Sequence, residues 1–383
     1  MTTFRERHAT LKARRVVAPG PRRCPARLAA TGPRGLPPLE VHITIGELGE
    51  FGLIARMARG LPPTRHVILG IGDDAAVLRA PDRRVVATTD LLIEGQHFRR
   101  DWSGPRDVGH KAAASSLADV AAMGAVPAGL LVAFAAPPQL PVSWADEFTA
   151  GLAAESARGG AAVVGGDVAR AATITIAVTA LGDLQGRSPV TRAGARPGDV
   201  IAVAGPLGQS AAGLALLGRG LIRPAELLAA HRRPQPWYDA GPEAARCGAT
   251  AMIDISDGLL ADLGHVADAS GVLIELTSAL LPHSRPLEEA AALIITAAAG
   301  RTLPSAVARA KREDQAAANA SPLEWMLSGG EDHALAAAFP PEAALPARWS
   351  VIGRVRAPGT RAGTGVRVDG ERHRGRAGWE HFR

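Results

Sequence analysis

The sequence has few cysteines, few aromatic residues and no long apolar run. Cys24 and Cys247 are the only cysteines among 383 residues, and their spacing gives neither a disulfide framework nor a zinc site, which fits a reducing cytoplasm. Aromatic residues make up 4% of the chain. No segment approaches the roughly 20 consecutive apolar residues of a membrane span, so we expect no membrane association.

Lysine is also scarce. Lys12, Lys111 and Lys311 are the only three, and none of them follows the Gly-x-x-x-x-Gly pattern of a P-loop. A nucleotide site in this chain would therefore have to work without a Walker lysine.

Positive charge is concentrated at one end of the chain. Residues 1–44 hold nine Lys or Arg against two Glu, whereas the whole chain carries a formal charge of +6. The remainder is close to neutral, so we expect no nucleic-acid binding by the body of the protein. Residues 1–44 lack an apolar period and are predicted to be a disordered basic tail, most simply a dispensable extension.

The rest of the chain is long for one hydrophobic core, which favours two domains. The segment 186–199 is dense in Gly, Pro and Arg and precedes a new apolar strand at 200–204. We therefore predict an N-terminal domain over 45–186 and a C-terminal domain over 187–383.

Apolar periods indicate the main elements within these domains. We predict helices over residues 45–59, 106–124, 143–158 (with Ser143 as N-cap) and 259–269, and a largely helical segment over 283–324. The turn at 205–210 is predicted to open a further helix that runs to 217. We predict strands over residues 66–71, 85–87, 130–134, 161–164, 173–181, 200–204, 249–255, 272–276, 335–339 and 349–355.

One pattern recurs along the chain: a strand, a turn of Gly, Ser or Thr, and then one or two acids. It occurs at residues 70–74, 85–90, 163–167, 252–257 and 326–332. A single case would be an ordinary solvated turn, because Asp and Gly favour turns. Five cases shared by two halves favour a composite cation site, since clustered carboxylates are stabilised by Mg²⁺, which prefers oxygen ligands. The pattern predicts a Mg²⁺-dependent phosphoryl-transfer enzyme.

These residues match a known family. The motifs at 70–74, 88–90, 117–124, 165–167, 191–192, 253–258 and 327–332 resemble, in order, those of thiamine-monophosphate kinases in the aminoimidazole-ribonucleotide-synthetase-like superfamily. The resemblance covers roughly residues 46–382. It departs at His333 and Ala334, where the family usually has an aromatic residue and an acid, and it does not extend to the tail or to 283–324.

The resemblance implies a two-domain α/β fold with a mixed sheet in the C-terminal domain, and a homodimer in which N-terminal strands of two subunits pair. It implies ATP-dependent phosphorylation of thiamine monophosphate to thiamine diphosphate by direct in-line transfer with several Mg²⁺ ions. The metal ligands that it implies are Asp74, Thr88, Thr89, Asp90, Asp119, Asp167, Asp254 and Asp257. The ATP contacts that it implies are Gly166, Asp167, Arg192 and Ser256. The substrate contacts that it implies are His97, Glu331 and Trp379.

Alternatives remain at this point. Another ATP-using enzyme of the same superfamily would share the scaffold; selenophosphate synthetases, however, need a reactive Cys with a nearby Lys, and Cys24 has only arginines around it. A non-catalytic nucleotide- or metal-binding paralogue would bind without turnover. An ATP-dependent assay with competing substrates separates these hypotheses.

Overall fold

The structure is a computed structural model that describes residues 43–59, 61–72, 75–282, 284–299, 320–358, 363–375 and 377–379. Asp74 and almost all of the predicted tail therefore lie outside the described residues. None of the helices in these ranges is both long enough and apolar enough to span a membrane.

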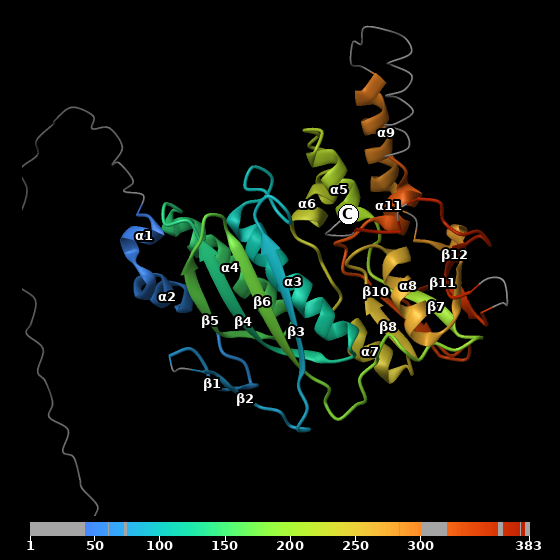
Figure 1. Cartoon of the computed structure of the whole chain (residues 1–383), viewed down its shortest axis with the longest axis horizontal. Helices are drawn as coiled ribbons and strands as arrows, with labels where there is room; N and C mark the ends of the chain where they lie inside the picture. The colour runs from blue at the N-terminus through green and yellow to red at the C-terminus, as the bar shows by residue number, and fades with distance from the viewer. Residues whose placement is uncertain are drawn as a thin grey trace, which may run out of the picture. The chain divides into compact units, whose positions relative to one another are not determined.

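A four-stranded sheet forms the first half of the described chain. Its order is β3-β6-β4-β5, with β4 and β5 parallel and the other neighbours antiparallel. The strands are β3 (Val86–Ile93), β4 (Val126–Ala136), β5 (Ala162–Arg170) and β6 (Thr175–Asp183). Helices α3 (Pro105–Ala122) and α4 (Val142–Arg158) cover one face of this sheet and lie behind it in Figure 1.

The two faces of this sheet differ because side chains alternate along each strand. Thr88 and Asp90 point toward α3, where both find hydrogen-bond partners. Leu91 and Leu131 point the other way and are 48% and 37% exposed. Among the described residues no helix covers this second face, which we call the open face.

Helices α3 and α4 cross at very close range. A Cβ atom added to Gly109 would lie 2.0 Å from the carbonyl oxygen of Phe148, and one added to Gly151 would lie 2.0 Å from that of Arg106. Only glycine fits at both positions, so this crossing fixes how α3 sits on the sheet.

A short segment precedes the sheet. It contains α1 (Ile45–Leu48), α2 (Glu50–Ala58) and an antiparallel pair of strands, β1 (Val67–Leu69) and β2 (Val77–Leu78). The expected single helix over 45–59 is wrong, because Gly49 has a φ of 74° and separates α1 from α2.

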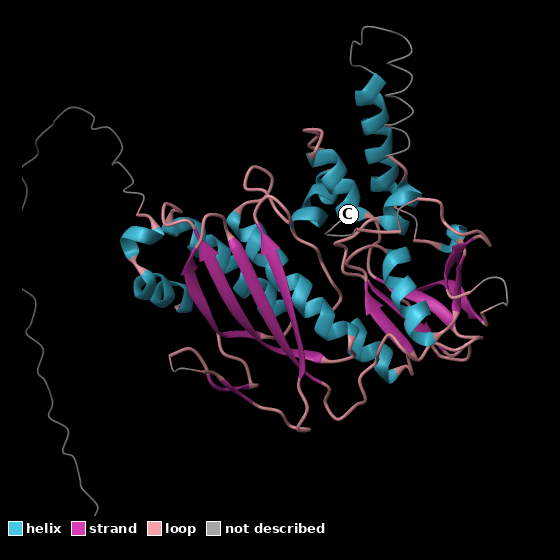
Figure 2. Cartoon of the chain, in the orientation of Figure 1, coloured by secondary structure: helices cyan, strands magenta, loops and turns pink. Residues whose placement is uncertain are grey.

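A six-stranded mixed sheet forms the second half, and its strands are drawn in magenta at the right of Figure 2. The order of these strands is β12-β9-β11-β7-β10-β8. Its strands are β7 (Val200–Ala204), β8 (Ala251–Asp254), β9 (Leu273–Leu276), β10 (Leu335–Phe339), β11 (Trp349–Arg356) and β12 (Gly365–Val368). Only the β9–β12 pair is parallel among these described strands. The helices of this half are α5 (Gln209–Leu217), α6 (Ala225–Arg232), α7 (Ala240–Arg246), α8 (Leu259–Ser270), a 3-10 turn (Ser278–Leu280), α9 (Arg285–Ala299) and α11 (Pro322–Ser328).

Helix α3 links the two halves. Its buried Leu117 belongs to the same apolar core as Ala337 and Phe339 of β10, whereas α8 packs into a separate core on the other face of the six-stranded sheet. A Cβ atom on Gly241 of α7 would lie 1.9 Å from the carbonyl oxygen of Ala121, so α3 and α7 are also in close contact. Side chains of α3 can therefore reach residues of both sheets.

The predicted α/β fold with a mixed C-terminal sheet is confirmed, and β7 and β10 have the expected bounds. Three details are wrong. Residues 88–90 and 165–167 lie inside β3 and β5 rather than in turns after them. Ser143 lies within α4, whose N-cap is Pro141. Residues 326–328 are the end of a helix, α11, and residues 329–332 follow that helix and not a strand. Helices α6 and α7 and strands β2 and β12 were not predicted, and residues 300–319 lie outside the described ranges.

Candidate active site

Two acids of the first half interlock β3 with α3. Thr88 Oγ1 donates a hydrogen bond of 2.6 Å to Asp119 of the helix, and Ser116 Oγ of the helix donates one of 2.6 Å to Asp90 of the strand. Each carboxylate therefore comes from one element and takes its donor from the other. The alternation along β3 explains why Thr88 and Asp90, two residues apart, both face α3.

Asp254 at the end of β8 brings a third acid to this place. It is 4% exposed, and its Oδ2 lies 3.2 Å from Nδ1 of His333. Nε2 of the same imidazole lies 3.3 Å from the hydroxyl oxygen of Ser115 on α3. His333 thus connects the carboxylate of the second sheet to the helix that carries Ser116 and Asp119.

The three carboxylates repel one another in a poorly hydrated environment. Burial, and then the charges of Asp254 and Asp90, raise the pKa of Asp119 to about 7. Burial also raises the pKa of Asp90, and the charge of Asp254 raises it further. Burial alone would lower the pKa of His333, but its hydrogen bond to Asp254 and the charge of that carboxylate raise it.

A cation would relieve this repulsion, and the oxygen donors of the three acids suit Mg²⁺. The described side chains do not form a complete metal site: no three His, Cys, Asp or Glu residues among them lie close enough together to hold a metal ion. The donor chemistry and the mutual repulsion therefore fit magnesium, while the full ligand set is not assembled by these residues alone.

Glu331 lies in a second polar cluster beside α3. Lys111 Nζ donates a hydrogen bond of 3.0 Å to Glu331 Oε2 and another of 3.2 Å to the carbonyl oxygen of His97. His231 Nδ1 of α6 lies 3.5 Å from the same Glu331 oxygen and 3.1 Å from Ser210 Oγ. Two of the predicted substrate contacts, His97 and Glu331, are thus brought together by a buried lysine.

The groups in this cluster shift the pKa values of Glu331 and His231. Burial tends to raise the pKa of Glu331, but the charge and hydrogen bond of Lys111 together with the charges of His231 and His333 hold that pKa below its ordinary value. Burial, followed by the charge of Lys111, lowers the pKa of His231 to about 4. Near neutral pH the cluster therefore contains one carboxylate, one ammonium group and a neutral imidazole.

Three backbone segments of the C-terminal half run alongside one another at the site. The N–H group of Glu331 donates to the carbonyl oxygen of Ser256 at 2.8 Å, and that of Trp379 donates to the carbonyl oxygen of Asp257 at 3.0 Å. A Cβ atom on Gly330 would lie 2.4 Å from the Ser256 oxygen, so the close approach requires glycine. The predicted contacts Ser256, Asp257, Glu331 and Trp379 are therefore neighbours, with the Trp379 side chain 57% exposed.

Two further buried acids shape these segments. The carboxylate of Asp332 accepts hydrogen bonds from the N–H groups of Gly208 and Ser210, so it caps the start of α5. Asp262 accepts hydrogen bonds of 3.1 and 3.0 Å from the N–H groups of Asp257 and Gly258. Burial raises the pKa of both Asp262 and Asp332 to about 7. Both acids hold loops in place rather than face a ligand.

Three of the expected site residues lie away from these clusters. Thr89 and Asp167 are exposed on the open face, because Asp167 pairs with Ala133 of β4 and shares the face of Leu131. Gly166 is its neighbour on the edge strand β5. Asp90 and β5 are separated by β6 and β4, a span of roughly 14 Å across the sheet.

Arg192 is also distant from the acids. Its carbonyl oxygen accepts a hydrogen bond of 3.0 Å from Ser270, at the end of α8 opposite Asp257. The backbone positions of Arg192 and Asp257 are thus separated by about the length of α8, roughly 18 Å. Their roles as ATP and metal contacts stay predictions.

Sequence reasoning missed Lys111, His231 and Asp262 as site residues. The scarcity of lysine was a usable signal for Lys111, since it lies in the helix that also carries the motif at 117–124. His333 was noticed only as a departure from the family pattern. No sequence signal predicts His231, because its helix was not predicted at all.

Comparisons with known proteins agree with this geometry. Residues 72–184 match the family model "AIR synthase related protein, N-terminal domain", and residues 196–329 match "AIR synthase related protein, C-terminal domain". The thiamine-monophosphate kinase of Mycobacterium tuberculosis (strain CDC 1551 / Oshkosh) is 46% identical over 339 residues, which cover 88% of this chain and 93% of that protein. The thiamine-monophosphate kinase of Escherichia coli (strain K12) is 38% identical over 300 residues, which cover 76% of this chain and 83% of that protein.

Solved structures give the same result. The structure described as "AaThiL complexed with AMPPCP and TMP" is 34% identical, with a TM-score of 0.67, and the match covers 88% of this chain and 98% of that one. The hydrogenase maturation protein HypE shares the fold at a TM-score of 0.61 and 18% identity, with 80% of this chain and 92% of that chain covered. The fold, the paired acids and these matches together show that this chain belongs to the thiamine-monophosphate kinase family of AIR-synthase-related proteins.

Proposed function

We propose that this chain transfers the γ-phosphoryl group of ATP to the phosphate of thiamine monophosphate, producing ADP and thiamine diphosphate. A phosphate oxygen of thiamine monophosphate forms the new bond to the γ-phosphorus while the bond to the β–γ bridging oxygen breaks in line. The observation that carries this proposal is the 46% identity to a thiamine-monophosphate kinase over 88% of the chain. The solved relative that holds an ATP analogue and TMP supports both substrates.

Phosphoryl transfer requires neutralisation of charge more than covalent help, and the acids fit that need. Asp90, Asp119 and Asp254 would hold Mg²⁺, with Asp257, Thr88 and residues outside the described ranges, Asp74 among them, as further ligands. When bound, the ions would neutralise the phosphate oxygens on which charge develops. Thr88 and Ser116 hold two of these carboxylates in place before any substrate arrives.

The remaining predicted contacts divide between the two substrates. Gly166, Asp167, Arg192 and Ser256 are proposed for ATP. His97, Glu331 and Trp379 are proposed for thiamine monophosphate, where a carboxylate and an indole face suit a cationic thiazolium and its aminopyrimidine. The backbone contact that brings Trp379 to Asp257 supports a shared acceptor pocket with Glu331.

We further propose that two copies of the chain associate through the open face of the four-stranded sheet. That face exposes Leu91 and Leu131, and exposed large apolar side chains on a sheet face without a covering helix favour an interface. Thr89 and Asp167 share this face, so a second copy would cover them. The dimer would then explain why two predicted metal ligands lie apart from Asp90 and Asp119 in a single chain.

A competition assay tests the proposed activity. The purified full chain is incubated with ATP and Mg²⁺ and an equimolar mixture of thiamine, thiamine monophosphate and an aminoimidazole ribonucleotide precursor, and the products are separated by chromatography. Formation of thiamine diphosphate from the monophosphate alone supports the proposal. Turnover of the ribonucleotide precursor instead would assign the chain to another reaction of the superfamily. The few cysteines are consistent with a cytoplasmic enzyme.

A further inference from the structure

Lys111 occupies an unusual position for a lysine. It is 4% exposed, whereas lysine side chains are seldom fully buried unless they are paired. Its ammonium group donates to Glu331 of the C-terminal half and to the backbone of His97 in the loop after β3. These two residues come from distant parts of the chain and are both proposed contacts of thiamine monophosphate. Lys111 is therefore the physical connection between two walls of the proposed acceptor site.

An ion pair of this kind adds little to stability. The Lys111 side chain is removed from water, whereas the Glu331 side chain is 34% exposed, so solvent screens the attraction while the desolvation of the lysine still has its full cost. Glu331 also adopts a φ of 64°, in the left-handed region that residues other than glycine seldom occupy. A strained residue held by a buried lysine is better explained by the position it gives to its carboxylate than by stability.

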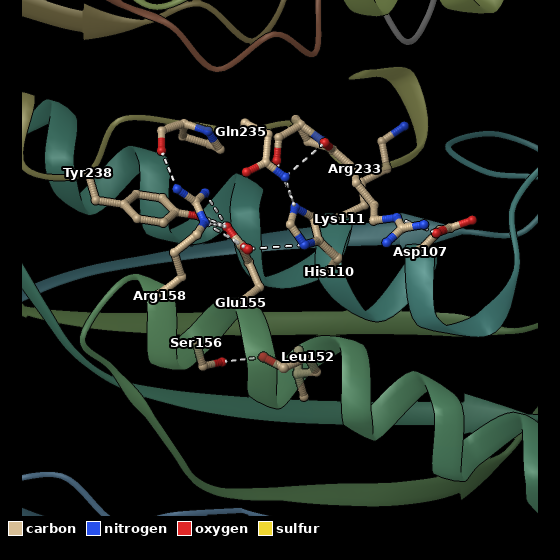
Figure 3. Close-up of polar contacts among 12 residues, drawn as sticks. Asp107, His110, Lys111, Leu152, Glu155, Ser156, Arg158, Arg233, Gln235 and Tyr238 are labelled. Atoms are coloured by element: carbon tan, nitrogen blue, oxygen red, sulfur yellow. Dashed lines mark hydrogen bonds and ion pairs between the residues drawn. The ribbon is translucent and has the colours of Figure 1, made fainter. Parts of the chain in front are cut away.

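The second partner of Glu331 is fixed relative to Lys111. His231 on α6 reaches Glu331 from another side, and the chain that follows α6 is bound tightly to α3. Asp107 of α3 forms an ion pair of 2.6 Å with Arg233, and His110 Nε2 lies 2.8 Å from the carbonyl oxygen of Pro234 (Figure 3). Helices α3 and α6 therefore cannot move apart without breaking these contacts.

A buried cluster on α4 strengthens this connection. Glu155 has a side chain that is 2% exposed, and its carboxylate accepts a hydrogen bond from Tyr238 and lies 3.0 Å from His110 Nδ1 (Figure 3). Arg158 pairs with the same carboxylate and donates to the carbonyl oxygen of Pro236. The segment 233–238 is thus held against α3 and α4, so Lys111 and His231, the two groups that approach Glu331, are held in fixed positions relative to each other.

We propose that Lys111 is a positioning residue for the thiamine monophosphate acceptor: it orients the Glu331 carboxylate and the His97 loop, and so sets the affinity for the acceptor but not for ATP. The proposal rests on the proposed function. It assigns Lys111 no contact with the transferred phosphoryl group, and therefore predicts a selective effect on one substrate.

The test measures equilibrium binding of thiamine monophosphate and of a non-hydrolysable ATP analogue, each alone, by titration calorimetry on the full chain. Lys111→Met removes the ammonium group, and Arg106→Met is the matched control, because Arg106 lies on the same helix in an exposed ion pair with Glu147. A hydrogen bond to a charged group contributes about 1.5–3 kcal/mol, so Lys111→Met should weaken binding of thiamine monophosphate about 10- to 100-fold. Binding of the ATP analogue should change less than about two-fold, as should both affinities of Arg106→Met.

Two further variants separate positioning from a general loss of structure. In the background of Glu331→Gln, Lys111→Met should weaken acceptor binding less than it does in the wild type, because the part of its influence that passes through the Glu331 charge is already lost and only the part that passes through His97 remains. Lys111→Arg keeps the charge but places a wider, planar group against Glu331, and should weaken acceptor binding by more than about three-fold while it leaves the ATP analogue unaffected.

Four results would overturn the proposal: wild-type acceptor affinity in both Lys111 variants, equal losses for both ligands, a full additive loss in the Glu331→Gln background, or no binding of thiamine monophosphate by the wild-type chain. Only the last would also remove the proposed function. Should Lys111→Met not fold, the comparison of Lys111→Arg with the wild type decides the question by itself.

Discussion

Thr88 of β3 donates a hydrogen bond of 2.6 Å to Asp119 of α3, at the place where Asp254 arrives from the second sheet. This bond holds a carboxylate whose pKa is raised to about 7 by burial and by the charges of Asp254 and Asp90. The fold thus maintains an acid in a position that is unfavourable for its charge. A cation bound at this position would relieve the repulsion among the carboxylates, and this relief would favour its binding.

The first prediction concerns Asp119. Asp119→Asn should lower kcat by about 100-fold or more, because it removes a charge from the proposed magnesium site. The same substitution should leave the melting temperature of the metal-free protein unchanged or raised, because it relieves repulsion among three buried acids. Steady-state kinetics and thermal unfolding in EDTA measure the two effects. A large loss of stability together with a normal rate would contradict this role.

Thr88 provides a milder test of the same interaction. Thr88→Val preserves shape and removes only the hydroxyl donor, so Asp119 loses its orientation but keeps its charge. We expect kcat to fall by about 5- to 20-fold, which corresponds to part of the roughly 1.5–3 kcal/mol of one hydrogen bond to a charged group, because Asp119 keeps its charge. Thr277→Val is a suitable control, since Thr277 follows β9 in the other sheet. Equal rates for Thr88→Val and the wild type would show that the bond is incidental.

The close crossing of α3 and α4 predicts a contrast between two glycines. Gly109→Ala should destabilise the protein by about 3 kcal/mol or more, because its Cβ atom would lie 2.0 Å from the backbone oxygen of Phe148. Gly264→Ala in α8 meets no atom within 4 Å and should stabilise by about 0.5–1 kcal/mol through helix propensity. Chemical denaturation of both variants measures the difference, and a stable Gly109→Ala would mean that the helices can separate.

His231 predicts a specific dependence of stability on pH. Its pKa is lowered from 6.5 to about 4 in the folded chain, so the unfolded chain binds a proton more readily between these values. The stability that depends on neutral His231 is complete above pH 6.5 and is lost as the pH falls toward 4, by about 3 kcal/mol in all. Unfolding free energies of the wild type and His231→Asn at pH 7 and pH 4 should reveal a smaller pH dependence in the variant. If the unfolding free energies of the wild type and the variant change equally between pH 7 and pH 4, the His231 imidazole is solvated in the folded chain.

The open face predicts an effect on assembly. Leu131→Asp places a charge on the open face, on the inner strand β4, and should convert a dimer to a monomer in light scattering, with a loss of activity if Asp167 acts from a partner copy. Arg219→Asp, on an exposed helix end of the other half, is the control. A wild-type chain that is monomeric at all concentrations while fully active would remove the dimer proposal.

The local sequence pattern predicted the type of most strands and helices. It did not predict the contacts between the residues of the site. The bounds of β7 and β10 were predictable because each is a short apolar run, β7 between Asp199 and Gly205 and β10 ending just before Pro340. Asp90 was expected at the end of a strand, but β3 continues to Ile93 because Leu91 and Leu92 continue its alternation of exposed and buried side chains. The motif that contains Asp90 was identified in the sequence, but it lies inside the strand and not, as predicted, after it.

The polar clusters depend on tertiary packing that no local pattern encodes. Lys111 and Glu331 are 220 residues apart, and His333 reaches Asp254 across 79 residues. Glycines such as Gly241 that allow α3 to approach α7 resemble ordinary helix glycines in sequence. A resemblance to a family could supply the acids, whereas the lysine and histidines that hold them required the folded chain.

The central claim is that acids from both sheets form one magnesium site, and direct measurement of metal binding tests it most closely. Mn²⁺ can replace Mg²⁺ and be counted by electron paramagnetic resonance in the presence of a non-hydrolysable ATP analogue. We predict that Asp90→Asn, Asp119→Asn and Asp254→Asn each lower the number or the affinity of bound ions relative to the wild type. Unchanged Mn²⁺ binding in all three variants would contradict the claim.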